Sequence, residues 1–218
     1  MTSYVTPTSV EDALAVLQEQ SECARIIAGG TDILPDMRAG KRAPACLVDI
    51  TRIPGLRDIR VTAAYVEAGA CVTFAQLRDH PFIRGHVHVL AEAAASVGAA
   101  AIQNAATWGG NLVQAMPAAD GAIAALALEA EARIADSSGA TWQPVAALFA
   151  GPGCSTVDPT RQLITHIRFP LPAASWGTAW RRAGRRPSLI LPTVNCAAKL
   201  TLAADSSIAA AVVALGPV

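Results

Sequence analysis

The chain has 218 residues, of which 52% are hydrophobic and only 16% are charged. Basic and acidic residues number 17 each, so the formal net charge is zero and no basic surface for nucleic acid is expected. The longest apolar runs fall short of the roughly 20 residues that span a bilayer, and the N-terminal segment has no secretory signal pattern. These features predict a cytoplasmic protein without a membrane span, and the high apolar fraction indicates extra surface buried against partner subunits.

The first elements are a helix and two strands. The segment Thr8–Glu11 is typical of a capping box, and apolar residues at helical spacing follow it. Residues 24–28 predict a short buried strand that runs into Gly29 and Gly30, and residues 45–50 predict a second strand. Pro54 and Gly55 then mark a turn.

The rest of the chain mixes both element types. Thr73 is the expected N-cap of a helix, and Asp120 is expected to open an alanine-rich helix that ends near residue 129. A further helix is predicted over 88–97, and strands are predicted over 65–71, 132–135, 163–169, 178–182, 192–202 and 208–215, the last three as a meander. The fold class is therefore α+β, with weak boundaries near residues 55–65 and 170–178.

The five cysteines, Cys23, Cys46, Cys71, Cys154 and Cys196, are scattered singly. No C-x-x-C pair is present, so neither zinc nor an iron–sulfur cluster is predicted within this chain, and the cysteines are expected to be reduced. The histidines show no metal-ligand spacing, and no nucleophile–base or paired-carboxylate constellation is identifiable. No catalytic residue and no metal ligand are predicted.

Two glycine pairs are the candidate ligand-binding motifs. The first, in Ala28–Ile33, has neither the G-x-G-x-x-G order of dinucleotide-binding folds nor the Gly-Lys-Ser/Thr of a P-loop. For this pair taken alone, a tight turn between strand and helix is favoured over a phosphate-binding loop. Thr31 offers a hydroxyl, and Asp32 is suited to capping the turn's own amides.

The second pair, in Thr107–Asn111, repeats this design with a hydroxyl, two glycines and a side-chain amide. Glycine lets backbone amides approach a ligand closely, so two such turns are expected to hold the phosphates of one dinucleotide. Asp120 follows nine residues later and can accept hydrogen bonds from a ribose, although a helix N-cap role fits equally well.

Four segments of this sequence resemble one protein family: residues 4–13, 26–34, 69–77 and 102–112. The resemblance is to the FAD-binding medium subunit of molybdenum hydroxylases, a group that includes carbon monoxide dehydrogenase, 4-hydroxybenzoyl-CoA reductase and the flavin domain of xanthine dehydrogenase. It runs from residue 4 to the C-terminus with the motifs in family order. The implied fold is a two-subdomain FAD-binding module of the vanillyl-alcohol-oxidase (PCMH-type) kind, over 1–58 and 59–175, with an incomplete C-terminal domain over 176–218.

The resemblance also implies a set of FAD-binding residues. The amides of Gly29, Gly30, Gly109 and Gly110 are expected to hold the pyrophosphate. The full set comprises Ile26, Ile27, Ala28, Gly29, Gly30, Thr31, Asp32, Ile33, Val97, Thr107, Trp108, Gly109, Gly110, Asn111, Asp120, Ile164 and Arg181.

Three features depart from the family pattern. Trp108 stands where an aliphatic residue is usual, and it either packs on the cofactor or fills the core. The cysteine-bearing insertion of the 4-hydroxybenzoyl-CoA reductase type is missing, and the chain ends early in what resembles the C-terminal domain. Arg181, Arg182, Arg185 and Arg186 form the one dense basic cluster, which is suited to phosphate contact, to an acidic partner or to a solvated turn.

The function implied by the resemblance is that of an FAD-binding electron-transfer subunit. Substrate oxidation is expected at a molybdenum cofactor on a large subunit, with 2Fe-2S clusters on a small subunit passing electrons to FAD and then to NAD or another acceptor. Two alternatives stay open at this point: a self-contained flavin oxidoreductase of the same fold, and an assembly subunit without FAD.

Overall fold

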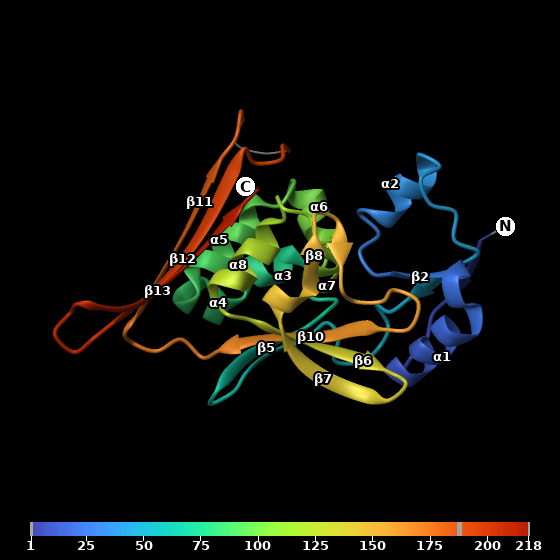
Figure 1. The fold of residues 1–218 in the computed structure, drawn as a ribbon, viewed down its shortest axis with the longest axis horizontal. Coiled ribbons are helices and arrows are strands. Elements are labelled where there is room, and N and C mark those ends of the chain that lie inside the picture. Colours follow the sequence, from blue (N-terminus) through green and yellow to red (C-terminus); the bar gives the residue numbers. More distant parts are fainter. Residues whose placement is uncertain (1, 187–188, 218) are drawn as a thin grey trace.

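The computed structural model describes residues 2–186 and 189–217, and its strands form three main sheets and a small hairpin (Figure 1). The first sheet is parallel, with the order β1-β3-β2. Helix α1 packs on β2 and β3 of this sheet. The elements of this part are β1 (Ser3–Val5), α1 (Val10–Gln20), β2 (Ala24–Ile27), α2 (Ile33–Arg38) and β3 (Cys46–Asp49), with a 3₁₀ turn at Ser21–Cys23.

The second sheet is antiparallel and five-stranded, with the order β4-β5-β10-β6-β7, and helices cover one of its faces (Figure 1). Its strands are β4 (Ile59–Val61), β5 (Tyr65–Gly69), β6 (Glu131–Asp136), β7 (Gly139–Pro144) and β10 (Leu163–Pro170). The helices are α3 (Phe74–Asp79), α4 (Pro81–His86), α5 (His88–Ser96), α6 (Ala100–Ala105), α7 (Trp108–Val113) and α8 (Asp120–Ala127). A 3₁₀ turn at Val145–Leu148 and the hairpin of β8 (Phe149–Gly151) and β9 (Cys154–Ser155) complete this part.

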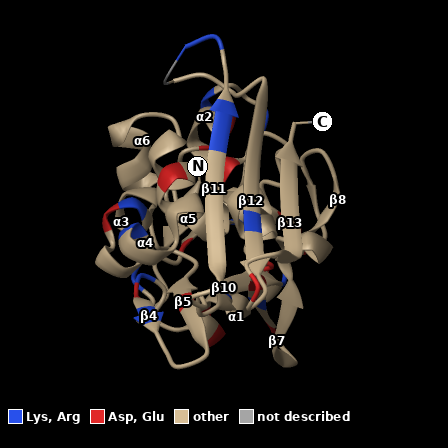
Figure 2. Cartoon of the chain, turned by 90° about the vertical axis from the view of Figure 1, so that its left-hand side faces the viewer, with Lys and Arg blue, Asp and Glu red and all other residues tan. Residues whose placement is uncertain are grey.

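The third sheet is the predicted meander, with the order β11-β12-β13. Its strands are β11 (Trp176–Ala183), β12 (Val194–Leu202) and β13 (Ile208–Gly216). One face packs on α5 and α8. Figure 2 looks onto the other face, which is almost free of charge over β12 and β13. Exposed apolar side chains there include Leu200, Val213 and Leu215.

Two hydrophobic cores hold these layers together. The larger core lies among the second sheet, helices α3 to α8 and the third sheet, and it includes Phe74, Trp108, Phe169 and Trp180. The smaller core joins α1 and the first sheet to Leu163 of β10 and to Cys71, which follows β5. Because β10 and the segment after β5 reach into the smaller core, the first sheet is fixed against the second.

Most of the elements expected from sequence are present, with small differences at their ends. The strand expected over 24–28 ends at Ile27, and the helix expected over 88–97 ends at Ser96. The capping box at Thr73 is confirmed, since Thr73 and Gln76 make both of its hydrogen bonds. The first helix is capped one residue later than expected: Ser9, not Thr8, accepts a hydrogen bond from the Asp12 amide at 3.0 Å.

The largest difference concerns the second glycine pair, which lies in the first turn of helix α7 and not in a turn between elements. Thr107 is the N-cap of α7, and its hydroxyl accepts from the Gly110 amide at 3.2 Å. Two consecutive glycines disfavour a helix by about 1 kcal/mol each relative to alanine. Packing overrides that preference here, because α7 packs on β10 and α8 and its Gly109 amide bonds to the carbonyl of Ala70.

Candidate cofactor site

A cavity of about 400 Å³ lies between the first sheet and the helical layer of the second. One wall is the end of β2 and the segment that follows it, over residues 25–33. The opposite wall comes from α6, α7 and the residues just before them. A third side is closed by residues 157–164, which include the first two residues of β10. A concave cavity of this size between two structural units is a usual place for a cofactor.

Most of the residues predicted to bind the cofactor line this cavity. From the first wall these are Ile26, Ile27, Ala28, Gly29, Gly30, Thr31, Asp32 and Ile33; from the others, Val97, Thr107, Gly109, Gly110, Asn111 and Ile164. The fold therefore brings together two motifs that are about 80 residues apart in sequence. Trp108, Asp120 and Arg181 lie elsewhere and are treated below.

The loop of residues 28–32, here called the glycine loop, approaches the α6–α7 junction closely. A Cβ on Gly29 would lie 2.0 Å from the Ala105 carbonyl oxygen, and Gly30 has a φ of +71° that L-residues rarely adopt. Within the part of the chain that the structure describes, the backbone N–H groups of Gly29, Gly30, Thr31 and Asp32 donate no hydrogen bond. These amides are available to a ligand, as anion-binding loops require.

The glycines of α7 are used differently. The Gly109 amide donates to the Ala70 carbonyl at 3.0 Å, and the Gly110 amide donates to the Thr107 hydroxyl at 3.2 Å. The expectation that these two amides hold a pyrophosphate is therefore corrected, because both already have acceptors within the protein. A Cβ on Gly109 would lie 2.6 Å from that of Ala70, whereas one on Gly110 would meet only the Thr107 hydroxyl, at 2.9 Å. Gly110 is exposed at the cavity and is the glycine that leaves room beside it.

Trp108 fills the core and does not reach the cavity wall. Its side chain is fully buried, its Nε1 donates to the Gly121 carbonyl at 3.1 Å, and its ring meets Phe169 edge to face at 6.3 Å between centroids. Of the two roles left open for Trp108 from sequence, these contacts favour the core.

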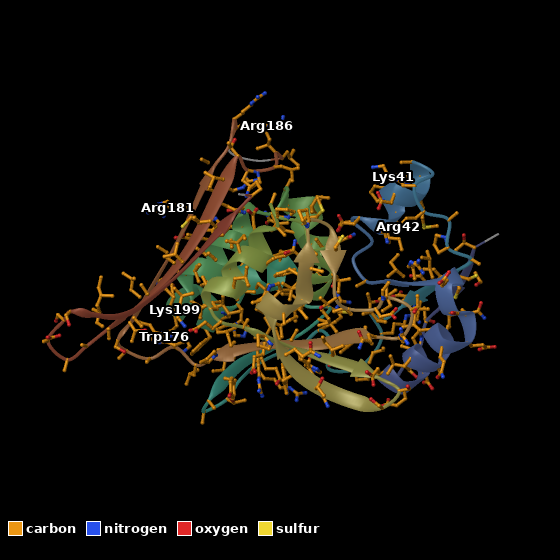
Figure 3. The ribbon with its side chains drawn as sticks, viewed as in Figure 1. Lys41, Arg42, Trp176, Arg181, Arg186 and Lys199 are labelled. Carbon is orange, nitrogen blue, oxygen red and sulfur yellow. The ribbon has the colours of Figure 1, made fainter. Side chains whose placement is uncertain are left out.

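Arg181 lies far from the cavity. It is on the outward side of β11 with its side chain 84% exposed, and its nearest acidic partner is Glu92 at 3.9 Å. Figure 3 shows it on the third sheet, across the helical layer from Arg42 near α2. Because side chains alternate along a strand, Arg181 points out and its neighbour Arg182 points in. The cation next to α8 is thus Arg182.

Asp120 is buried at the start of α8 and faces the third sheet. Its Oδ1 accepts from Asn195 Nδ2 at 2.6 Å, and its Oδ2 lies 3.5 Å from Arg182 Nε. Burial raises the pKa of the Asp120 carboxyl, while the Asn195 hydrogen bond and the Arg182 charge oppose that shift. Its partners in this structure are protein groups.

Several cavity residues were not expected from sequence. Val113 and Gln114 follow Gly110 by three and four residues, so a helical reading of 107–113 would have placed them on the same face. Arg25 directly precedes the first motif, whereas Arg42 and Leu191 have no sequence signal that connects them to either motif. The remaining unexpected lining residues are Ile50, Ala70, Phe74, Ile102, Ala106, Val157, Pro159, Gln162 and Leu163.

Polar contacts within the protein shape two parts of the wall. The Asp32 carboxylate is 3.4 Å from the Thr31 hydroxyl. Burial raises the pKa of Asp32, while hydrogen bonds from Thr31 and Gln114 oppose that shift. Asp158 accepts from the amide and hydroxyl of Thr160 and from the Arg161 guanidinium, and together these contacts lower the pKa of Asp158 to about 2. The second set folds residues 157–162 into the turn that closes the cavity.

Among the described residues, no group of three or more histidine, cysteine, aspartate or glutamate side chains is placed to hold a metal ion. No helix in the same residues has the length and apolar character needed to cross a membrane.

An α+β fold with a loop of free amides facing a helix start across an apolar cavity defines a module that binds a phosphate-bearing cofactor. The chain belongs to the family described as the FAD binding domain in molybdopterin dehydrogenase, whose model matches residues 1–172. FAD is accordingly its cofactor.

Individual relatives agree with this assignment. The nicotinate dehydrogenase FAD-subunit of Eubacterium barkeri is 30% identical over 195 residues, covering 88% of this chain and 66% of that protein. The 6-hydroxypseudooxynicotine dehydrogenase complex subunit alpha of Paenarthrobacter nicotinovorans is 35% identical over 184 residues, covering 84% and 62%. A solved structure of carbon monoxide dehydrogenase from Hydrogenophaga pseudoflava matches with a TM-score of 0.93 at 28% identity, over 99% of this chain and 74% of that chain. The chain thus spans about two thirds of the length of these curated relatives.

The cavity residues fit FAD. The free amides of the glycine loop and the cations Arg25 and Arg42 suit a pyrophosphate, which binds backbone N–H groups and guanidinium ions. Val97, Ile102 and Ile164 supply apolar surface of the kind that a flavin ring requires.

Proposed function

We propose that this chain is the FAD-carrying electron-transfer subunit of a molybdenum-containing hydroxylase or dehydrogenase, with FAD in the cavity between the first sheet and α7. The observation that carries the proposal is the meeting of the glycine loop and the start of α7 around one cavity. In this proposal the pyrophosphate lies on the amides of residues 29–32. The α7 wall contributes the side chains of Thr107, Asn111 and Gln114.

Bound FAD supplies one- and two-electron redox chemistry, and the protein supplies binding and orientation. The apolar residues of the wall exclude water from the cavity, and the turn at Asp158 fixes the side chains of Val157 and Gln162 there. The part of the chain that the structure describes offers no nucleophile–base pair at this cavity. This favours electron transfer, with substrate oxidation on another subunit.

Partners belong to the same proposal. We expect a large subunit with the molybdenum cofactor and a small subunit with 2Fe-2S clusters, and NAD or another acceptor as the final oxidant. The exposed apolar side chains on the third sheet are typical of surfaces that become buried in assemblies, and they support a heteromeric complex. The division into PCMH-type subdomains over 1–58 and 59–175, followed by 176–218, is part of this proposal, since each range contains one of the three main sheets.

FAD is expected to stabilise the protein. At a free concentration 100 times its Kd, a ligand that binds only the native state adds about 2.7 kcal/mol. For a domain of this size we expect Tm to rise by roughly 5–11 °C in a thermal melt of the apoprotein. NAD⁺ at the same concentration is the control, because it shares the pyrophosphate and adenosine but has no flavin. An unchanged Tm with FAD would refute the proposed site.

Electron transfer is expected to depend on partner subunits. The isolated flavoprotein should show no turnover with organic substrates, while the co-expressed complex should reduce its bound flavin when the substrate of the molybdenum subunit is added. Absorbance at the flavin band reports this directly. Rapid turnover by the isolated chain would instead identify a self-contained oxidoreductase.

A further inference from the structure

One cavity residue, Leu191, belongs to neither main wall. It lies in the connection between β11 and β12, and it lines the cavity although the residue is 72% exposed. Two residues earlier, the Leu189 amide donates to the Gly98 carbonyl at 3.3 Å. Gly98 directly follows Val97, another cavity residue, so this connection reaches the cavity at a defined place.

The base of the connection is held by a pair of inward-facing residues. Arg182 on β11 and Asn195 on β12 are directly opposite each other in the antiparallel register. The Arg182 guanidinium also donates to the carbonyl of Ile190, the residue next to Leu191. Arg182 thereby connects the base of the strand pair to the backbone that carries Leu191.

Both members of this pair converge on one carboxylate, that of Asp120. Asn195 donates to Oδ1, and Arg182 lies beside Oδ2. Asp120 and Asn195 are 5% and 0% exposed, and the Arg182 side chain is 11% exposed. A buried ion pair of this kind adds little net stability, but removing one partner is costly because it leaves the other charge buried and unpaired.

We propose that Asp120 is a positioning residue for the cofactor cavity: through Arg182 it holds the Ile190–Leu191 backbone so that Leu191 covers one side of the cavity. The inference rests on the proposed FAD site, and it gives Asp120 an indirect role. The Asp120 carboxylate then keeps Leu191 over the bound cofactor, and Leu191 in that position slows the release of FAD.

The chain offers a matched control for this link. Lys199 Nζ, also on β12, donates to Glu129 just beyond the other end of α8, and it lies 4.5 Å from the centroid of the Trp176 ring. This second ion pair joins the same helix region to the same strand. Figure 3 shows Lys199 and Trp176 at the end of the third sheet away from Arg186, which is in the connection. Breaking the Lys199–Glu129 ion pair weakens the contact between α8 and the third sheet without changing the contacts of Leu191.

The experiment compares Asp120→Asn, Leu191→Ala and Glu129→Gln in the full chain. The first readout is the rate of FAD release from the reconstituted protein, followed by absorbance after dilution. The second is hydrogen exchange at the Leu189 amide in the apoprotein. We expect FAD release to be about tenfold faster in Asp120→Asn and in Leu191→Ala, which corresponds to about 1.4 kcal/mol. Glu129→Gln should release FAD at the wild-type rate.

The two readouts separate the possible failures. Exchange at Leu189 should be faster in Asp120→Asn alone, and this measurement needs no cofactor. Equal effects of Asp120→Asn and Glu129→Gln on FAD release would mean that Asp120 only docks the sheet, which overturns the proposal. Faster exchange with unchanged FAD release would overturn the role of Leu191 at the cofactor. Failure of the wild-type protein to bind FAD would refute both the proposed function and this inference.

Discussion

Gly110→Ala is expected to weaken FAD binding by about 5- to 150-fold while leaving the protein folded. An added methyl group in a close contact costs about 1–3 kcal/mol, which sets this range. Gly110 is the suitable position because it lines the cavity and an added Cβ would have only the Thr107 hydroxyl within 4 Å, at 2.9 Å. In the first turn of α7, alanine also has a better helix propensity than glycine, by about 1 kcal/mol. The measurement is the Kd of the apoprotein for FAD, by fluorescence titration.

Gly85→Ala is the matched control. Gly85 is also an exposed helical glycine, in α4, and a Cβ there would meet nothing within 4 Å. It should bind FAD with the wild-type Kd. The Tm of both apoproteins shows whether crowding of the Thr107 cap has unfolded α7. If the Gly110 variant is as stable as the control and binds FAD equally well, Gly110 does not border the cofactor.

The other glycines of the two motifs illustrate what sequence can and cannot reveal. Both pairs were expected to admit a ligand's phosphates, and both do reach the cavity. Yet Gly29 is required because the glycine loop approaches the Ala105 carbonyl, and Gly109 because α7 packs on Ala70. Each glycine is needed because two backbone segments that are far apart in sequence come too close there for a side chain. A motif shows that a side chain is excluded, but only the fold shows whether protein or ligand excludes it.

The longer helices and eight of the strands were predictable because their patterns are local, whereas β1, β4, β7, β8 and β9 were not expected. The meander at the C-terminus and the capping box at Thr73 depend on alternation and on residues three apart, and both are present. Helix α7 was missed because paired glycines argue against a helix, and its stability comes from packing that no local pattern encodes.

Arg181 and Asp120 show the same limit at the site. The basic cluster was visible in sequence, but the strand's alternation decides that Arg182 faces inward and Arg181 faces solvent. A one-residue difference in register moves a cation from the surface to a buried carboxylate. Leu191 had no signal at all, because it reaches the cavity only through the placement of the third sheet.

Trp108 is expected to matter for stability and not for FAD. Trp108→Ala removes a fully buried indole that contacts Phe169 and should lower the free energy of unfolding by about 3–5 kcal/mol. Trp108→Phe keeps an aromatic ring but removes the hydrogen bond from Nε1 to the Gly121 carbonyl, so about 0.5–1.5 kcal/mol should be lost with that bond. Both values come from urea unfolding of the apoprotein, which separates them from any effect of the cofactor.

The phenylalanine variant then decides between the two roles of Trp108. If the indole is a core residue, folded Trp108→Phe should bind FAD with a Kd within a few-fold of the wild type, because its ring lies behind the cavity wall and α7 keeps its Thr107 cap. If the indole instead packs on the cofactor, the same variant should keep the wild-type free energy of unfolding and bind FAD more than tenfold more weakly. The Nε1 bond to Gly121 favours the first result, since that carbonyl belongs to α8 and lies within the larger core.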